Sequence, residues 1–352
     1  MRPTFSIICF TVLSGAGYGV WFVLGFGLAT LWPRCVATHP LGDGSGMFMQ
    51  CSYPALITHL FVVGFGLVTA GLVSSLGHLG KPLRAWRALS QWRSSWLSRE
   101  GVAALLTYVP AIALLAVPLS QAWQARGLAP GDAFVPWLPD AILRPIGAVL
   151  ALMCVVTVYC TAHIYSSLKP IRAWHDRHVT PAYLLLALHA GLLWMWALST
   201  LPHAFVVRND PRVNETDAML LLLALTSLAL VVLKWSYWRG IDAAPRAGAG
   251  HATGLESLGD VHAFEAPHTE ENYLTHEMGF VLARKHARDL RAITILFAFV
   301  GPGVLAMLAL ALPSIRIFAA WAGLVGGMLG LFVERWLFFA QARHTVIAFY
   351  GR

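Results

Sequence analysis

Eight long apolar runs divide this chain, and they restrict its fold more than any other feature of the sequence. A run of about 20 apolar residues is long enough to cross a ~30 Å hydrocarbon layer as a helix. The runs cover approximately residues 5–32, 56–79, 102–119, 141–165, 182–201, 218–233, 292–312 and 318–339. We therefore expect an all-α membrane protein, a bundle of eight transmembrane helices that forms one polytopic domain over residues 1–352.

The composition agrees with a chain that is largely buried in lipid. Of its 352 residues, 57% are hydrophobic and only 12% are charged, whereas a soluble domain carries about 25% charged residues. The first apolar run is too long for the core of a signal peptide, and no small-residue cleavage site is obvious, so we expect a retained helix. The net charge of +8 does not indicate a nucleic-acid-binding protein, because the basic residues follow alternate loops.

The distribution of the basic residues predicts the orientation. With eight spans, both termini lie on one side of the membrane, and that side holds 19 of the 25 Lys and Arg residues. Cytoplasmic loops carry an excess of Lys and Arg. We therefore expect both termini, and a long loop at about residues 239–290, to be cytoplasmic, in the inner membrane of a bacterium.

The five cysteines leave one question open. Cys35 and Cys51 fall in the same polar loop, on the side predicted to be periplasmic, where a disulfide is stable. The alternative is two unrelated free thiols. The other three cysteines lie inside predicted spans, and the sequence contains no CxxC pair, so we expect no iron–sulfur cluster or zinc site on this chain.

A basic motif follows the second span. Residues 77–87 read GHLGKPLRAWR, whereas residues 56–76 contain no charged residue. His78 is therefore expected near the membrane surface, one turn from the first charge, Lys81. An imidazole there can exchange protons with water while it contacts an apolar ligand between helices. A quinone needs this chemistry, because its redox change moves protons together with electrons.

Further ionisable groups are expected at a similar depth, near the cytoplasmic face. Burial of such groups in a membrane is costly unless they are paired or hydrated, so they are candidates for function. With His78, they are Glu100, His163, Tyr165, Glu334 and Arg335. Together these groups could bind the carbonyls of a quinone and relay protons. The alternative is a set of interface-seeking side chains and structural ion pairs, and for Glu334 with Arg335 alone we favour the ion pair.

Two histidines offer a rival site. His59 and His189, on different helices, are able to bind haem iron from both sides. However, His59 begins its span at the periplasmic side, whereas His189 lies about 10 Å from the cytoplasmic side, at roughly 1.5 Å per residue. Because these depths match poorly, we expect no haem. The histidines between residues 251 and 276 lack regular metal-ligand spacing, so we expect no bound metal.

The segment from residue 80 to residue 100 is rich in Trp and Arg. Such residues form a belt at headgroup depth in membrane proteins, and they also dominate the hot spots of protein interfaces. Both interpretations can hold. The residues expected to contact a partner protein are Lys81, Trp86, Arg87, Trp92 and Arg93.

Four motifs give the sequence a family resemblance. They are PTFSIICFTVLSGAGYG at residues 3–19, GHLGKPLRAWRALSQWRSSWLSREG at 77–101, IYSSLKPIRAWH at 164–175 and ERWLFFAQARHTV at 334–346. With these motifs the chain resembles, over nearly its whole length, the membrane anchor subunit of dimethyl sulfoxide reductase-type molybdoenzymes. The resemblance implies an anchor without metal that binds a quinol and passes electrons to an iron–sulfur subunit, which feeds a molybdopterin catalytic subunit. It also implies that His78 is the histidine of the quinol site, Arg84 its basic residue and Glu100 its acidic partner.

One departure from the family concerns orientation. In the best-known members the motif loop and the catalytic subunits face the periplasm, whereas the basic motif loop of this chain favours the cytoplasm. Membrane-bound sulfite-oxidising enzymes keep their catalytic subunits in the cytoplasm, so we expect electrons to pass from sulfite to menaquinone or ubiquinone. The alternatives are a quinol-oxidising anchor of a dimethyl sulfoxide or other S- or N-oxide reductase, and a purely structural anchor without a quinone site.

Overall fold

The computed structural model describes residues 4–30, 37–40, 47–49, 54–125, 140–201, 213–243, 249–261, 264–265 and 286–345. Eight helical segments in these ranges are long and apolar enough to span a membrane, which confirms the predicted number. Seven are the helices α1 (Phe5–Thr30), α2 (Pro54–Ser75), α3 (Trp96–Ala125), α4 (Asp140–Ser166), α5 (Val179–Ser199), α6 (Val213–Ala243) and α12 (Arg316–Ala340). The remaining span joins α10 (Ala287–Ile293), a π-helical turn η5 (Thr294–Val300) and α11 (Gly301–Ala311).

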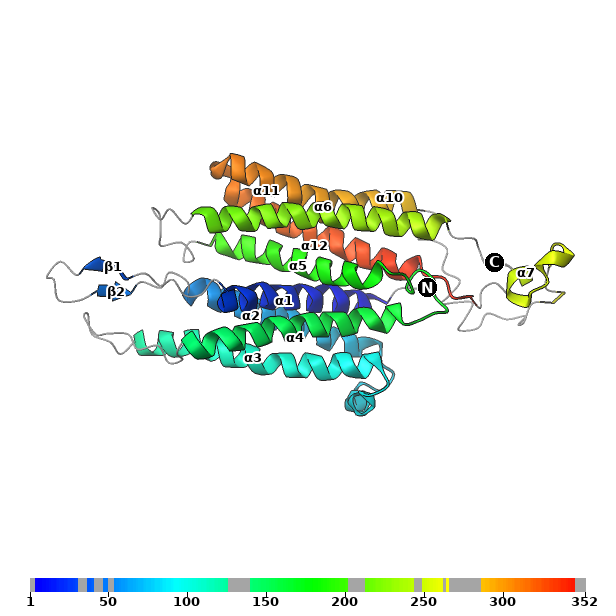
Figure 1. Ribbon diagram of the computed structural model, residues 1–352, viewed down its shortest axis with the longest axis horizontal. Coiled ribbons are helices and arrows are strands. Elements are labelled where there is room, and N and C mark those ends of the chain that lie inside the picture. The colour runs from blue at the N-terminus through cyan, green and yellow to red at the C-terminus, as the bar shows by residue number, and fades with distance from the viewer. Residues whose placement is uncertain are drawn as a thin grey trace.

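Short elements connect the spans at both ends of the bundle. One end carries the antiparallel strands β1 (Ala37–Pro40) and β2 (Met47–Met49), which add a small hairpin to the predicted all-α fold. The other end carries the start of α1, the end of α12 and the short helix α7 (Ala249–Thr253) (Figure 1). We call these the hairpin end and the termini end. The 3₁₀ segments η1 (Leu76–His78) and η2 (Pro82–Gln91) connect α2 to α3 at the termini end.

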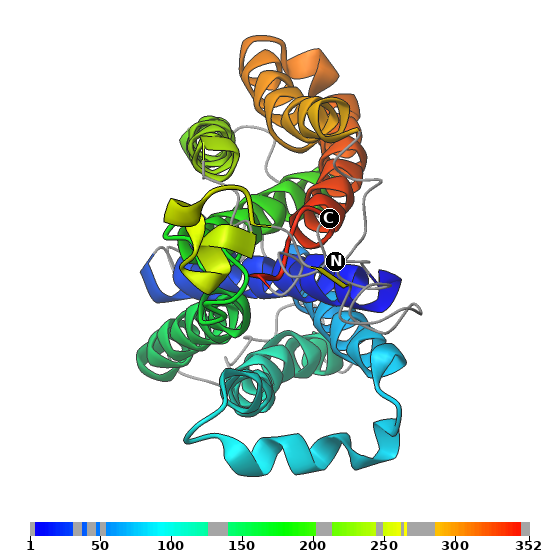
Figure 2. The same ribbon diagram turned by 90° about the vertical axis from the view of Figure 1, so that its right-hand side faces the viewer.

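Helix α1 forms the centre of the bundle. Seen end-on, α2, α3 and α4 lie on one side of it, and α5, α6, α11 and α12 lie on the other (Figure 2). It contacts α2, α4, α5 and α12 directly. Polar groups of both halves meet around α1, where α4 and α5 also contact each other, and the candidate site forms there.

Glycines allow the neighbouring helices to approach α1 closely. A Cβ atom on Gly19 would overlap the backbone of α5 at Ala187, and one on Gly191 would overlap α1 at Gly19 itself. Gly25 of α1 faces Gly147 of α4 in the same way. Small residues at such crossings are how helices pack in lipid, where the hydrophobic effect does not drive them together.

Helix α6 extends beyond its predicted end. The apolar run predicts a helix end at about residue 233, whereas α6 continues to Ala243 and Lys234 lies inside the bundle. A lysine normally ends an apolar run, but this one has a buried acidic partner. The predicted disulfide candidates Cys35 and Cys51 lie outside the described residues.

Candidate functional site

The ionisable residues predicted for the site all lie at the termini end, but at different depths in the protein. Glu100, Glu334 and Arg335 are buried, with exposed fractions of 5%, 1% and 4%. Tyr165 and His163 are half-buried, whereas His78 and Arg84 are exposed. The structure therefore separates an internal group from a group at the surface.

The core of the internal group is a cluster of three charges. Glu334 accepts hydrogen bonds from its neighbour Arg335, one of them from Nη2 at 2.8 Å, and it also forms an ion pair with Lys234. Lys234 comes from α6, whereas the other two residues belong to α12. With two cations and one carboxylate, this charge cluster carries a formal excess of one positive charge.

Aromatic rings enclose the two cations. The guanidinium carbon of Arg335 lies 4.4 Å from the ring centre of Tyr183 and 4.6 Å from that of Phe338. The Lys234 ammonium nitrogen lies 4.8 Å from the ring centre of Tyr237. Ring faces attract cations electrostatically, most strongly where water is excluded. They compensate part of the cost of burying this excess charge.

Tyr165 belongs to the same aromatic environment. Its ring stacks on Tyr183 at 5.9 Å and meets Phe338 edge-on at 5.7 Å. Trp174 also packs against Tyr165, and its indole nitrogen donates a hydrogen bond to the backbone carbonyl of Phe338 at 3.2 Å. Tyr165, Glu334 and Arg335 are thus brought together, as the sequence predicted for their depth.

Glu100 lies on α3, away from the charge cluster. Thr161 of α4 donates a hydrogen bond to its Oε1 at 3.3 Å. Among the described residues, no cation forms an ion pair with Glu100. Buried acids of this kind are rare in membrane proteins and mark ion paths or proton relays.

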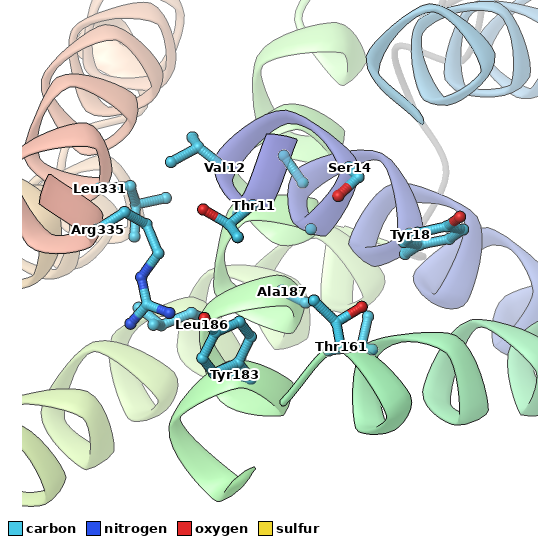
Figure 3. Close-up of a pocket in the computed structure, with 14 residues that line it drawn as sticks. Thr11, Val12, Ser14, Tyr18, Thr161, Tyr183, Leu186, Ala187, Leu331 and Arg335 are labelled. Atoms are coloured by element: carbon cyan, nitrogen blue, oxygen red, sulfur yellow. The ribbon is translucent and has the colours of Figure 1, made fainter. Parts of the chain in front are cut away.

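A small cavity lies at the meeting of α1, α4, α5 and α12 (Figure 3). Thr161, the partner of Glu100, and Arg335 of the charge cluster both line it. We call it the inner cavity. Its volume is ≈ 30 Å³, room for about two water molecules. The polar side chains that line it are Thr11, Ser14, Tyr18, Thr161, Tyr183 and Arg335.

Three polar atoms at this cavity have no hydrogen-bond partner in the described part of the chain. They are the hydroxyls of Tyr18 and Tyr183 and the Nη1 atom of Arg335. The exposed fractions of these residues are only 2%, 6% and 4%. Buried polar groups are almost always hydrogen-bonded, so three unpartnered donors at one cavity require an explanation.

His163 lies outside this internal group. Its ring packs against Trp96 and Tyr159, with ring centres 4.6 Å and 4.0 Å away. Residues two positions apart along a helix, such as Thr161 and His163, point to nearly opposite faces. Since Thr161 faces the inner cavity and Glu100, His163 faces away from them.

His78 and η2 form the surface group. His78 ends η1, and among the described residues no hydrogen bond, ion pair or ring contact joins it to Glu100. Segment η2 has no buried residue. Ser98 of α3 donates a hydrogen bond to the backbone carbonyl of Ala88, and Arg99 donates to that of Trp92 at 3.0 Å. The predicted docking residues Lys81, Trp86, Arg87, Trp92 and Arg93 are all exposed.

His189, half of the rival haem pair, has no free ring nitrogen. It is fully buried, its Nε2 lies 2.9 Å from the carbonyl oxygen of Ala298 and its Nδ1 lies 3.1 Å from Oγ1 of Thr226. Nε2 therefore carries the hydrogen, and Nδ1 accepts one from Thr226. The ring connects α5, α6 and the π-helical turn η5. Across the described ranges, no group of three His, Cys, Asp or Glu residues is placed to hold a metal.

Sequence reasoning missed four residues of this site: Tyr18, Thr161, Tyr183 and Lys234. Three of them are neutral side chains inside apolar runs, where nothing in the sequence separates them from packing residues. A signal for Lys234 did exist, because a lysine at the end of an apolar run needs a partner if it lies within the membrane.

Comparison with known proteins gives two matches. The model of the family "DMSO reductase anchor subunit (DmsC)" matches residues 48–242. A sulfite dehydrogenase subunit from Allochromatium vinosum is 28% identical over 361 residues, which cover 99% of both chains. No solved structure matches the chain.

Proposed function

Because the chain belongs to the DMSO reductase anchor subunit (DmsC) family, and so is the membrane anchor of a molybdoenzyme complex, we propose that it passes electrons between an iron–sulfur subunit and quinone. The iron–sulfur clusters and the molybdopterin belong to partner subunits. One observation carries this proposal. Glu100 is buried, no cation among the described residues forms an ion pair with it, and it lies at the same end of the bundle as His78. A carboxyl group and an imidazole at one membrane surface are the proton carriers that a quinone requires.

The quinone head group binds at the termini end, where α2 ends and α3 begins. His78 and Arg84 are accessible there, and Glu100 lies one turn inside α3. The inner cavity, at ≈ 30 Å³, admits water but not a quinone ring, so the ring binds outside it. The other four predicted site residues then surround the quinone position and are not direct ligands of one pocket. They are His163, Tyr165, Glu334 and Arg335.

The electron donor that we propose is sulfite. Sulfite and water yield sulfate, two electrons and two protons, and quinone takes up two electrons and two protons to form quinol. Support comes from the relative named as part of a sulfite dehydrogenase, which matches along the full length, and from the basic termini end, which favours the cytoplasm. The family description instead names a DMSO reductase, in which electrons would flow from quinol to the partner.

The test uses the intact complex in the bacterial inner membrane, with His78→Ala and Glu100→Gln as variants. We expect assembly and electron transfer from sulfite to a water-soluble dye to continue, while quinone reduction falls at least about tenfold, the scale on which loss of a positioned proton carrier acts. His286→Ala is the matched control, because His286 is exposed at the start of α10. Unchanged quinone reduction in both variants would contradict the proposed site.

A further inference from the structure

The donors and acceptors around the inner cavity are complementary to water. Its unpartnered donors are the Tyr18 and Tyr183 hydroxyls and Nη1 of Arg335. Thr11 and Ser14 already donate their hydroxyl hydrogens to carbonyls of their own helix, Thr11 at 3.0 Å and Ser14 at 2.6 Å. Their oxygens still have lone pairs to accept with. A water molecule can accept from the first set and donate to the second.

The cavity also has the size that holds water, and six of its fourteen lining residues offer polar side chains as partners. Its ≈ 30 Å³ exceed the roughly 10–15 Å³ that one water requires, and cavities with several polar partners are hydrated whereas apolar ones stay empty. Leaving these buried donors unpaired would carry the full cost of removing them from water. Water in the cavity removes that cost.

The cavity reaches Glu100 on one side. Thr161, which lines the cavity, is the link to Glu100. The Oγ1 atom of Thr161 lies 3.3 Å from Glu100 and 3.1 Å from the carbonyl of Thr157, but it has one hydrogen to donate. An ionised Glu100 takes that hydrogen. A protonated Glu100 donates its own instead, and Thr161 then turns to Thr157.

The cavity reaches the charge cluster on the other side. In Figure 3, Arg335 and Tyr183 lie to the left of the cavity, while Thr161 and Tyr18 lie to the right. Arg335 uses Nε and Nη2 for Glu334, so Nη1 is left for the cavity. Thr161 therefore connects the cavity to Glu100, and Arg335 connects it to Glu334.

We propose that the inner cavity is a water-binding site between Arg335 and Thr161, the hydrogen-bond partner of Glu100, and that its hydroxyls and water relay protons for the quinone reaction. This inference rests on the proposed function for its role, but not for the presence of water. A proton that Glu100 gives to quinone is replaced from the cavity water, and a proton that it takes from quinol is released to that water. The water exchanges these protons with solvent at the termini end, while Arg335 keeps its hydrogens and orients the water. The relay changes no oxidation state, because only protons move along it.

The presence of water is tested by electron cryo-microscopy of the whole complex at a resolution that reveals ordered solvent. We expect density in the inner cavity within hydrogen-bonding distance of the Tyr183 hydroxyl and Nη1 of Arg335. A well-resolved cavity without density would overturn the proposal.

The relay is tested with Tyr18→Phe and Tyr183→Phe, which remove one hydroxyl each and keep the ring. We expect quinone reduction to fall by at least about tenfold while dye reduction by the complex is unchanged. Tyr108→Phe is the control, since its hydroxyl bonds to Thr69 at 2.8 Å, outside the cavity. In case a variant does not assemble, the wild-type complex is also compared in H₂O and D₂O, where we expect slower quinone reduction in D₂O but equal dye reduction.

The outcomes separate the two proposals. The relay would be contradicted if the wild-type complex reduces quinone, both Phe variants do so at the wild-type rate, and D₂O has no effect. The proposed function would then remain intact. A wild-type complex that neither reduces quinone nor oxidises quinol would contradict the proposed function and the relay together.

Discussion

Lys234 of α6 forms an ion pair with Glu334 of α12, and the two side chains are only 2% and 1% exposed. The pair joins helices that are far apart in the sequence. It holds the carboxylate beside the inner cavity, next to Arg335. Since a buried charge is tolerated only when it is compensated, the pair ties the stability of this half of the bundle to the geometry of the candidate site.

Loss of the Glu334 carboxylate is expected to destabilise the protein strongly. Glu334→Gln keeps the side-chain volume but leaves the buried Lys234 and Arg335 without a carboxylate, and breaking a buried pair in this way costs about 3–5 kcal/mol. Thermal unfolding of the purified complex, followed by Trp fluorescence, measures the effect. Asp242→Asn is the control, because Asp242 is 60% exposed in its pair with Arg291 and such pairs contribute about 0–1 kcal/mol. Equal shifts for both variants would contradict this account.

The close approach of α1 and α5 is expected to tolerate no side chain at Gly19. Gly19→Ala places a methyl group against the backbone of α5, and overpacking of this kind costs about 1–3 kcal/mol. Gly27→Ala on the same helix meets nothing within 4 Å and is expected to be nearly neutral. The yield and melting temperature of each variant measure the difference. A Gly19→Ala protein as stable as Gly27→Ala would show that the helices pack differently.

His189 is expected to be a structural residue. His189→Leu leaves the buried Ala298 carbonyl without its ring partner, at a cost of about 1–3 kcal/mol. The Thr226 hydroxyl still has the Leu223 carbonyl as a partner, at 2.9 Å. We expect a lower melting temperature and an absorbance spectrum of the purified chain that is the same before and after the change. A haem band in the wild-type chain that disappears in the variant would reverse the assignment.

The η2 segment is expected to bind the iron–sulfur subunit. Trp86 is 67% exposed, and Arg87 lies over its ring at 5.6 Å. A double change, Trp86→Ala with Arg87→Glu, removes an aromatic anchor and reverses a charge, and loss of such a hot spot costs about 2 kcal/mol or more of binding energy. Co-purification of partner subunits with the tagged chain is the readout. Trp235→Ala, on an exposed position of α6, is the control and should retain the partners.

The sequence predicted the spans well because their signal is local. Apolar length alone marks a membrane helix, and all eight spans are present. Where one charge interrupted a run, at Lys234, the prediction ended the helix early, because the compensating carboxylate of Glu334 comes from a distant part of the chain.

The candidate site could be predicted only in part. Depth along a helix follows from counting residues, so Tyr165, Glu334 and Arg335 were correctly expected near one another. The direction of a side chain depends on which helices are neighbours, and the sequence does not provide this. His163 therefore turned out to face Trp96. The unpartnered Tyr18 and Tyr183 became visible only when four helices were placed around one cavity.

The most direct test of the account is sulfite-dependent quinone reduction by the complex purified from native membranes through a tag on this chain. The account predicts that an iron–sulfur protein and a molybdoprotein without an export signal co-purify, and that sulfite drives the reduction of quinone. A complex whose partners carry a twin-arginine export signal and whose activity consumes quinol would contradict the orientation and the electron direction. A chain that purifies alone from native membranes, with no quinone-linked activity, would contradict the central claim.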